Sequence, residues 1–215
     1  MKILYSIFAA FMATAVVSCD EHKDFPDTAM KTCDILCTDG KVVRYEEVKS
    51  QDKTPIAVVF YVNQNEDIQG TGYAVYLKDI EPYAYSDSLG VKHSTSADIS
   101  AFDGNSNTHA MYSTGTSPAA SAVFDIWQYG QSAYIPSVAQ IRLLYEARIA
   151  VNTYIRMCGG DEIPDNPDEC WYWTSTEVRD QEPAKAWLYS LASGALQETP
   201  KTQAHKVRPI ITLYN

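Results

Sequence analysis

Oxygen-bearing side chains occupy alternate positions in one short stretch of the sequence. Asp103, Asn105 and Asn107 carry carboxylate and amide oxygens, the ligand types that a calcium-binding loop supplies at this spacing. The bidentate glutamate that closes an EF-hand loop at its twelfth position is replaced by Thr114. A turn that caps a helix accounts for the same residues, and we favour that role over a metal site. The sequence therefore predicts no metal ion or other cofactor.

Other residues that could do chemistry lack partners at the required spacing. The four histidines, His22, His93, His109 and His205, form none of the paired motifs of a zinc site or a hydrolytic base. We expect them at the surface or in loops. The sequence contains neither a nucleophile elbow of the Gly-Xaa-Ser-Xaa-Gly type nor a glycine-rich phosphate loop. These observations predict a protein that is not an enzyme.

The N-terminal residues predict export and lipidation. Lys2 supplies a positive charge, and a short apolar run that ends at Val17 is followed by Ser18 and Cys19. Ser18 stands where a signal peptidase requires a small side chain, and the run is shorter than the roughly 20 residues that span a bilayer. The pattern resembles bacterial lipoprotein signal peptides, which implies that residues 1–18 are removed and Cys19 is acylated. An ordinary secretory signal is the alternative.

The charge of the chain limits its partners. There are 17 Lys and Arg residues against 27 Asp and Glu, a formal net charge of −10 at pH 7. Removing residues 1–18 takes away Lys2 and no acid, which gives −10 − 1 = −11. Such a surface repels nucleic acid and anionic lipid headgroups. We expect no nucleic-acid partner, and membrane attachment only through acyl chains on Cys19.

Residues 19–31 are predicted to form a lipidated tether. Asp20 and Glu21 directly follow Cys19, and this acid-rich start resembles the signal by which some Gram-negative bacteria carry lipoproteins to the outer face of the cell. A solvated linker explains the same composition, and both interpretations stay open. We expect an outer-membrane lipoprotein at the cell surface, with one domain over residues 32–215.

Four cysteines remain once Cys19 is assigned to the lipid, and an even number in an exported chain suggests disulfides. Cys158 and Cys170 flank a turn-rich stretch without apolar periodicity. We predict a Cys158–Cys170 bridge that staples this loop. Cys33 and Cys37 would lie about 13 Å apart on one strand, too far to bridge each other without a bend. Buried thiols are equally compatible with that pair.

Apolar patterns place strands at both ends of the predicted domain. Residues 33–45 form a hairpin pattern around Asp39-Gly40. The continuous apolar run over residues 56–62 is typical of a strand buried on both faces, and residues 73–77 are its expected partner. Further strands are expected over residues 171–174, 186–191 and 207–213.

One helix is clearly predicted, and a long polar region precedes it. Ser137 and Gln140 have capping-box spacing, an apolar stripe follows, and Gly159-Gly160 ends the helix. Residues 82–122 lack a regular period, which predicts functional loops or irregular segments. Tyrosines here and in the last third of the chain are candidates for an aromatic platform for sugar rings or a protein partner. They are Tyr83, Tyr85, Tyr112, Tyr129 and Tyr172, the last exposed if strand alternation buries Trp171 and Trp173.

Taken in order, several segments resemble one bacterial domain, found at the C-terminus of collagen-like adhesins and long catalogued as of unknown function. Residues 34–40, 58–62 and 74–79 look like its start. The later half fits better, through Asp103 to Thr108, Ser117 to Ala120, Ile135 to Tyr145, Trp171 to Glu177, Ala186-Trp187 and Val207 to Ile210. The resemblance covers most of residues 33–213.

The resemblance implies an α+β fold similar to C-type lectins, with two helices, a small twisted antiparallel sheet and long loops. It also implies a non-catalytic domain that binds a glycan or protein ligand in adhesion, because such folds present variable loops on a rigid sheet. The Glu-Pro-Asn or Gln-Pro-Asp triplet of calcium-dependent lectins is absent, and Glu182-Pro183-Ala184 is the nearest match. We therefore do not expect calcium-dependent sugar binding.

Two other functions are compatible with the same sequence. The first is a structural or assembly subunit of a surface appendage. The second is an enzyme of the formylglycine-generating type, since such enzymes share the general fold and use a cysteine pair. A structural disulfide between Cys158 and Cys170 accounts for that pair more simply.

Overall fold

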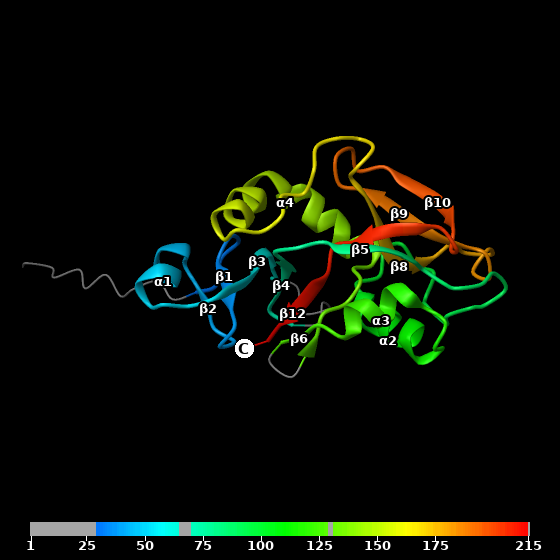
Figure 1. Ribbon diagram of the computed structural model, residues 1–215, viewed down its shortest axis with the longest axis horizontal. Coiled ribbons are helices and arrows are strands. Elements are labelled where there is room, and N and C mark those ends of the chain that lie inside the picture. Colours follow the sequence, from blue (N-terminus) through cyan, green and yellow to red (C-terminus); the bar gives the residue numbers. More distant parts are fainter. Residues whose placement is uncertain (1–28, 65–69, 129–130, 215) are drawn as a thin grey trace, which may run out of the picture.

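The computed structural model describes residues 29–64, 70–128 and 131–214. Within them the chain forms two five-stranded sheets, a two-stranded ribbon and four helices (Figure 1). The first sheet contains β1 (Ile35–Cys37), β2 (Val42–Val43), β3 (Pro55–Val62), β4 (Gly72–Tyr76) and β12 (Ile210–Leu213). The second contains β5 (Ile80–Ala84), β8 (Trp171–Glu177), β9 (Lys185–Ser190), β10 (Leu196–Pro200) and β11 (Ala204–Val207). The ribbon pairs β6 (Trp127–Gln128) with β7 (Gln131–Ser132), and the helices are α1 (Tyr45–Ser50), α2 (Gly104–Ser113), α3 (Pro118–Phe124) and α4 (Val138–Met157).

The first sheet is buried on both faces, in the antiparallel order β12-β4-β3-β1-β2. Because successive strand residues point to opposite faces, Val58 and Phe60 of β3 pack beneath α4. Ala57 and Val59 pack in a second cluster with residues of α2, α3 and the second sheet. This double burial explains why β3 is a continuous apolar run instead of an alternating one.

Two crossovers join the sheets. The chain leaves β4 and enters β5 through residues 77–79, and it leaves β11 and enters β12 through Arg208 and Pro209. In the second sheet the strand order is β10-β9-β8-β11-β5, and β8 pairs with β11 in parallel through Tyr172 and Lys206. Both crossovers reach the junction between the sheets, where the candidate site lies.

The helix α4 begins at the predicted capping box. The Ser137 hydroxyl accepts from the Gln140 backbone N–H, and the Gln140 side chain accepts from the Ser137 N–H at 3.0 Å. The same Gln140 Oε1 accepts from the backbone N–H of Gly104 at 3.1 Å, so one amide caps the starts of α2 and α4. A Cβ on Gly104 would lie 2.3 Å from that oxygen, which explains the glycine there.

Replacing Ser137 with alanine should lower the free energy of unfolding by about 1–2 kcal/mol, because the helix loses its cap and the hydroxyl's bond to Ala101 O at 2.7 Å. Urea denaturation followed by circular dichroism measures the loss. The exposed Ser113 at the end of α2 is the matched control. An equal loss in Ser113→Ala would contradict the capping role.

The predicted α+β class is confirmed, and so are the hairpin, β3 with its partner β4, and the long helix. The lectin-like arrangement of two helices on one small sheet is not: the described residues form four helices and two five-stranded sheets. The polar stretch 82–122 contains α2 and most of α3; the sequence indicated a helix cap at Asp103 but not the extent of either helix. Their residues are mostly Ser, Thr, Asn and Ala, so no apolar stripe marks them.

None of the helices in the described parts of the chain is long and apolar enough to cross a membrane. The predicted signal peptide, Cys19 and most of the predicted tether lie outside the described residues.

Candidate functional site

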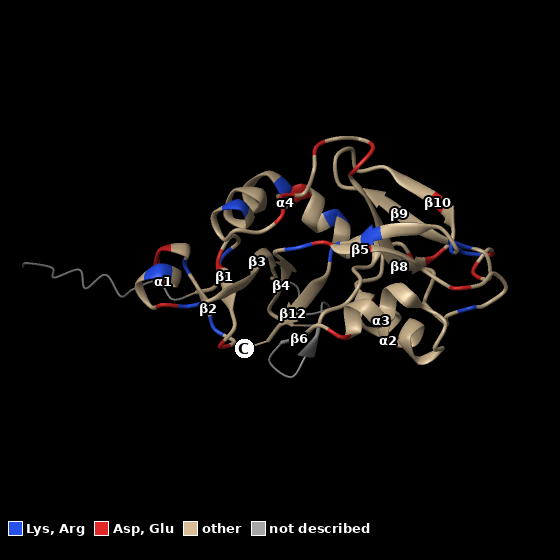
Figure 2. Cartoon of the chain, in the orientation of Figure 1, with Lys and Arg blue, Asp and Glu red and all other residues tan. Residues whose placement is uncertain are grey.

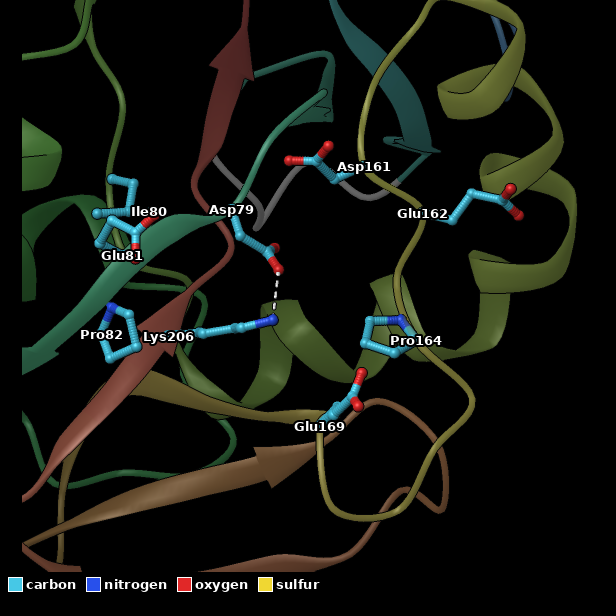
Figure 3. A pocket seen from close by; sticks show the side chains of 9 residues that line it. All are labelled: Asp79, Ile80, Glu81, Pro82, Asp161, Glu162, Pro164, Glu169 and Lys206. Carbon is cyan, nitrogen blue, oxygen red and sulfur yellow. Dashed lines mark ion pairs between the residues drawn. The ribbon is translucent and has the colours of Figure 1, made fainter.

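A pocket of about 300 Å³ opens at the junction of the two sheets (Figure 3). Residues from the β4–β5 crossover, β5, β11 and the loop after α4 form its walls. The lining residues are Asp79, Ile80, Glu81, Pro82, Asp161, Glu162, Pro164, Glu169 and Lys206. Five of these carry carboxylates and one carries an ammonium group, and Figure 2 shows acidic residues along the loop that follows α4.

The Asp79 carboxylate at the pocket wall is held by the guanidinium of Arg208, which is fully buried. Arg208 Nη1 donates to Asp79 Oδ1 at 2.8 Å. Its Nη2 donates to the carbonyl oxygens of Asp161 at 2.7 Å and Leu77 at 3.3 Å. The planar fork of arginine suits this arrangement, because it offers several donors in fixed directions. One side chain therefore ties together both crossovers and the loop after α4.

Two more donors face the same carboxylate. The Tyr172 hydroxyl donates to Asp79 Oδ2 at 3.0 Å, and Lys206 Nζ lies 3.5 Å from that oxygen (Figure 3). Burial, together with the charge of Asp79, raises the pKa of Tyr172 well above its ordinary value of 10. Tyr172 therefore stays protonated and acts as a donor.

The pocket has the chemistry of a recognition surface for cationic groups. Excess carboxylates accept hydrogen bonds from a lysine, an arginine or an amine. In the described parts of the chain, no group of three or more His, Cys, Asp or Glu side chains is placed to hold a metal ion. Each oxygen of Asp79 already accepts a hydrogen bond, one from Arg208 and one from Tyr172, so this carboxylate is held in place as part of the pocket wall.

A second cluster of charges is buried away from the pocket. Glu177, at the end of β8, forms an ion pair with Lys201, and both side chains are at most 1% exposed. The backbone N–H of His93 donates to Glu177 Oε1 at 2.9 Å, and the Thr95 hydroxyl donates to Oε2 at 2.9 Å. The cluster thus pins the segment around His93 to the second sheet.

Protonation in this cluster follows from its donors. His93 Nδ1 lies 3.0 Å from Lys201 Nζ and 3.5 Å from Glu177 Oε1, and Nε2 lies 3.3 Å from Thr116 Oγ1. Burial alone would raise the pKa of Glu177, but hydrogen bonds from His93 and Lys201 outweigh it and hold that pKa at about 2. Burial lowers the pKa of Lys201, and its pairing with Glu177 opposes the shift.

The expectation that the histidines lie at the surface or in loops holds for His93, which is in a loop although fully buried, and is wrong for His205, which is half-buried on β11. His109 is exposed, and His205 contacts Trp173 edge-on with ring centroids 5.2 Å apart. His22 lies outside the described residues.

The predicted aromatic platform is dispersed. Tyr85 and Tyr172 are fully buried, so these two residues are corrections to the prediction: Tyr85 donates to Ser175 O at 2.9 Å, and Tyr172 faces Asp79. Tyr83 on β5 and Tyr112 on α2 are exposed, at 39% and 42%. Tyr129 lies outside the described residues. Two sequence candidates therefore remain available to a ligand.

The oxygens proposed for a turn or metal site hold the start of α2. Asp103 precedes the helix, and its Oδ1 accepts from the Asn107 amide at 2.8 Å. Asn107 Oδ1 in turn accepts from the Ser96 backbone N–H at 3.3 Å. Asn105 is exposed. These contacts agree with a helix-start role, although Asp103 makes no side-chain cap bond of its own.

The predicted Cys158–Cys170 disulfide is not present, and both residues are free thiols. Cys170 Sγ lies 3.1 Å from Ser190 Oγ, next to Tyr189, whose ring contacts that of Tyr145. Cys158 is 13 residues beyond Tyr145 along α4, about 20 Å at the rise of a helix. Bridged Cα atoms lie within about 7 Å. The composition of the loop predicted this pairing. Cys158 lies at the end of α4, whereas Cys170 lies near Tyr145, so more than half of the helix separates the two cysteines.

The cysteine pair of a formylglycine-generating enzyme is not assembled either. Burial raises the pKa of the Cys158 thiol to about 11, and the nearby Cys37 adds to the shift. A reactive cysteine requires a lowered pKa and an accessible partner. The pKa of Cys158 is raised instead of lowered, and Cys170 lies too far away to be its partner.

The sequence did not indicate that five charged or titratable residues form the buried framework described above: Asp79, Arg208, Glu177, Lys201 and His93. A signal was present at Arg208, a charged residue between the apolar residues Val207 and Ile210 of two consecutive strands. No local pattern indicated its partner, because Asp79 lies 129 residues away.

Comparisons with known proteins give a structural likeness but no sequence match. No protein-family model matches the sequence, and no curated protein matches it. The fold is similar to the crystal structure of a fimbrial protein from Bacteroides ovatus, with a TM-score of 0.65 and 16% sequence identity. The alignment covers 84% of this chain and 48% of that one. The chain therefore shares its fold with about half the length of a fimbrial protein.

Proposed function

We propose that this protein is a subunit of a bacterial surface appendage, held at the outer membrane by lipid on Cys19. The observation that carries the proposal is the shared fold with the Bacteroides ovatus fimbrial protein over 84% of the chain. Because the chain spans 48% of that protein, the part it plays in an assembly is itself proposed.

Three features support a structural role at the surface. The sequence before Cys19 resembles a lipoprotein signal, and the net charge of −10 disfavours nucleic-acid partners. Three fully buried side chains, Glu177, Lys201 and Arg208, form ion pairs that join separate segments of the fold. Such use of charge fits a scaffold more than a catalyst.

The proposal is tested by deleting the gene in the bacterium that carries it and imaging the cells by negative-stain electron microscopy. We expect appendages to be lost or shortened and to return on complementation. Protease treatment of intact wild-type cells should degrade the protein, as expected for a surface location. Unchanged appendages together with protection from the protease would overturn the proposal.

Replacing Cys19 with alanine should move the protein from the membrane fraction to the soluble fraction, because the acyl chains supply the membrane affinity. Fractionation and intact-mass measurement check this, with Cys33→Ala as the control that keeps its lipid. A Cys19→Ala protein that stays in the membrane, with no mass change beyond the substitution, would contradict lipidation at this residue.

Adhesion to a glycan or protein is the second candidate function. The Tyr112 ring is 42% exposed and stacks on Phe124 with centroids 4.2 Å apart and planes 10° apart. A flat aromatic surface of this kind suits a sugar ring. On a glycan and matrix-protein array, we expect the ligand bound by the wild type to be bound by Tyr83→Ala as well, and not to be bound by Tyr112→Ala. A hit that both variants retain would place the ligand elsewhere.

A further inference from the structure

Two cysteines that are 121 residues apart in the sequence lie in one buried cluster. Cys37, the last residue of β1, is fully buried, and Cys158, the residue that ends α4, is half-buried. Both belong to the apolar cluster between the first sheet and α4, with Ile35, Val151 and Ile155. The thiols thus face the same interior from opposite layers.

A chain of contacts across the sheet places Cys37 near the end of α4. Cys37 is opposite Pro55 at the start of β3, and the next residue, Ile56, accepts from the Leu77 N–H at 3.1 Å. The Leu77 carbonyl accepts from the Asp161 N–H at 2.8 Å. A Cβ built on Gly160 would lie 2.5 Å from the same carbonyl oxygen, so the turn that contains Cys158 rests against this edge.

The segment after the hairpin provides an independent link. The Tyr45 hydroxyl donates to the carbonyl of Met157, the neighbour of Cys158, at 3.3 Å. The Tyr45 ring also packs edge-on against Tyr154 with centroids 6.2 Å apart. The start of α1, directly after the hairpin, is therefore held against the end of α4.

The environment of the two thiols disfavours their charged forms. Burial raises the pKa of Cys37, and burial with the neighbouring Cys37 raises that of Cys158. A thiolate is disfavoured there, whereas a disulfide carries no charge and meets no such penalty. The site suits a stable cross-link more than a reactive cysteine.

Cys37 and Cys158 are free thiols in this structure. We propose that they form a disulfide when the chain reaches an oxidising compartment. Cys158 is the more exposed of the two cysteines, and its thiolate, the minor form, attacks one sulfur of the disulfide of a thiol–disulfide oxidoreductase and releases the other sulfur as a thiolate. Cys37 then attacks Cys158 Sγ in the mixed disulfide and displaces the second sulfur. The two thiols lose two electrons and two protons, and the oxidoreductase gains them as a dithiol. This proposal does not depend on the proposed function.

The other two cysteines are placed differently. Cys170 Sγ contacts Ser190 Oγ at 3.1 Å and the Pro167 carbonyl at 3.3 Å, on the side of the second sheet. Cys33 lies before β1, and its backbone N–H donates to Val59 O at 2.7 Å. Four residues of extended chain, about 13 Å, separate it from Cys37. They serve as matched controls.

Peptide mapping tests the pairing directly. The full chain is equilibrated with reduced and oxidised glutathione, alkylated, and digested without reduction by an endoproteinase that cuts before aspartate. Because Asp34 separates Cys33 from Cys37, and Asp161, Asp165 and Asp168 separate Cys158 from Cys170, each cysteine falls on its own peptide. We expect residues 34–38 to be joined to residues 125–160. A link to the peptide of Cys33 or Cys170, or four alkylated thiols, overturns the proposal.

Thermal melts of serine variants give a second measurement. A bridge from Cys37 to Cys158 closes a loop of about 120 residues, so dithiothreitol should lower the midpoint of the wild type by about 10 °C. The variants Cys33→Ser and Cys170→Ser should show the same drop. Cys37→Ser and Cys158→Ser should melt at one temperature with and without reductant. A redox-independent wild-type midpoint would contradict the bridge.

Discussion

Replacing Arg208 with methionine should lower the free energy of unfolding by about 3–5 kcal/mol, the range for removing one partner of a buried ion pair. Asp79, only 14% exposed, would lose the guanidinium at 2.8 Å. The carbonyl oxygens of Leu77 and Asp161 would each lose a donor as well. Equilibrium urea unfolding at pH 7, followed by tryptophan fluorescence and circular dichroism, measures the change.

The control is another arginine paired with a carboxylate at the surface. Arg156 donates to Glu162 at 3.1 Å, and their side chains are 61% and 43% exposed. Arg156→Met should cost less than about 1 kcal/mol, because water screens an exposed pair. The loss of stability in Arg208→Lys should fall between those of the other two variants, since lysine keeps the charge but not the fork of donors. Equal small losses in all three variants would show that the junction of the sheets does not rely on Arg208.

Replacing Lys201 with methionine is the second change with a large expected effect. It leaves the buried Glu177 carboxylate without its cation, which should cost about 3–5 kcal/mol at pH 7. Lys185, whose Nζ lies 2.9 Å from Glu198 with both side chains more than 30% exposed, is the matched control. Lys185→Met should leave the midpoint of urea unfolding almost unchanged. A Lys201→Met protein as stable as this control would contradict the role of the cluster.

The same pair predicts a pH dependence. On folding, the pKa of Glu177 falls from its ordinary value of 4.5 to about 2, so the folded state binds fewer protons than the unfolded state between these values. The stability that this group contributes is complete above about pH 5 and is lost as the pH falls toward 2. In Lys201→Met, burial should raise the folded-state pKa of Glu177 toward or above its unfolded value, so the loss of stability on acidification should shrink or reverse. Urea midpoints measured from pH 2 to 7 decide between these outcomes.

How far the sequence predicted the fold depended on whether local residues carried the signal. The strand β3 was predictable because burial on both faces requires a continuous apolar run. The helix α4 was predictable from the spacing of Ser137 and Gln140. The helices α2 and α3 were missed because tertiary contacts, such as the Gln140 amide on Gly104, stabilise them in place of an apolar stripe.

The candidate site was less predictable than the fold. The Asp79–Arg208 pair forms only when the two crossovers meet, and the Glu177–Lys201–His93 cluster joins three distant segments. Tyr172 lies on the opposite side of β8 from Trp171 and Trp173, as alternation predicts, but that side is buried too, because the second sheet lies against α4 as well as against α2 and α3. The alternation of side chains along a strand predicts exposed residues only where one face of the sheet is in contact with water.

The antiparallel order of the first sheet determines where force would enter the molecule. Strands β1 and β12 are separated by β3 and β4, so they run in opposite directions. The start of β1 and the end of β12 therefore lie at the same end of the strands. A pull on residues before β1 and after β12 is therefore borne by three strand pairings within this sheet. The second sheet, with α2 and α3, lies outside this load path, and its loops can change sequence without weakening the mechanical connection.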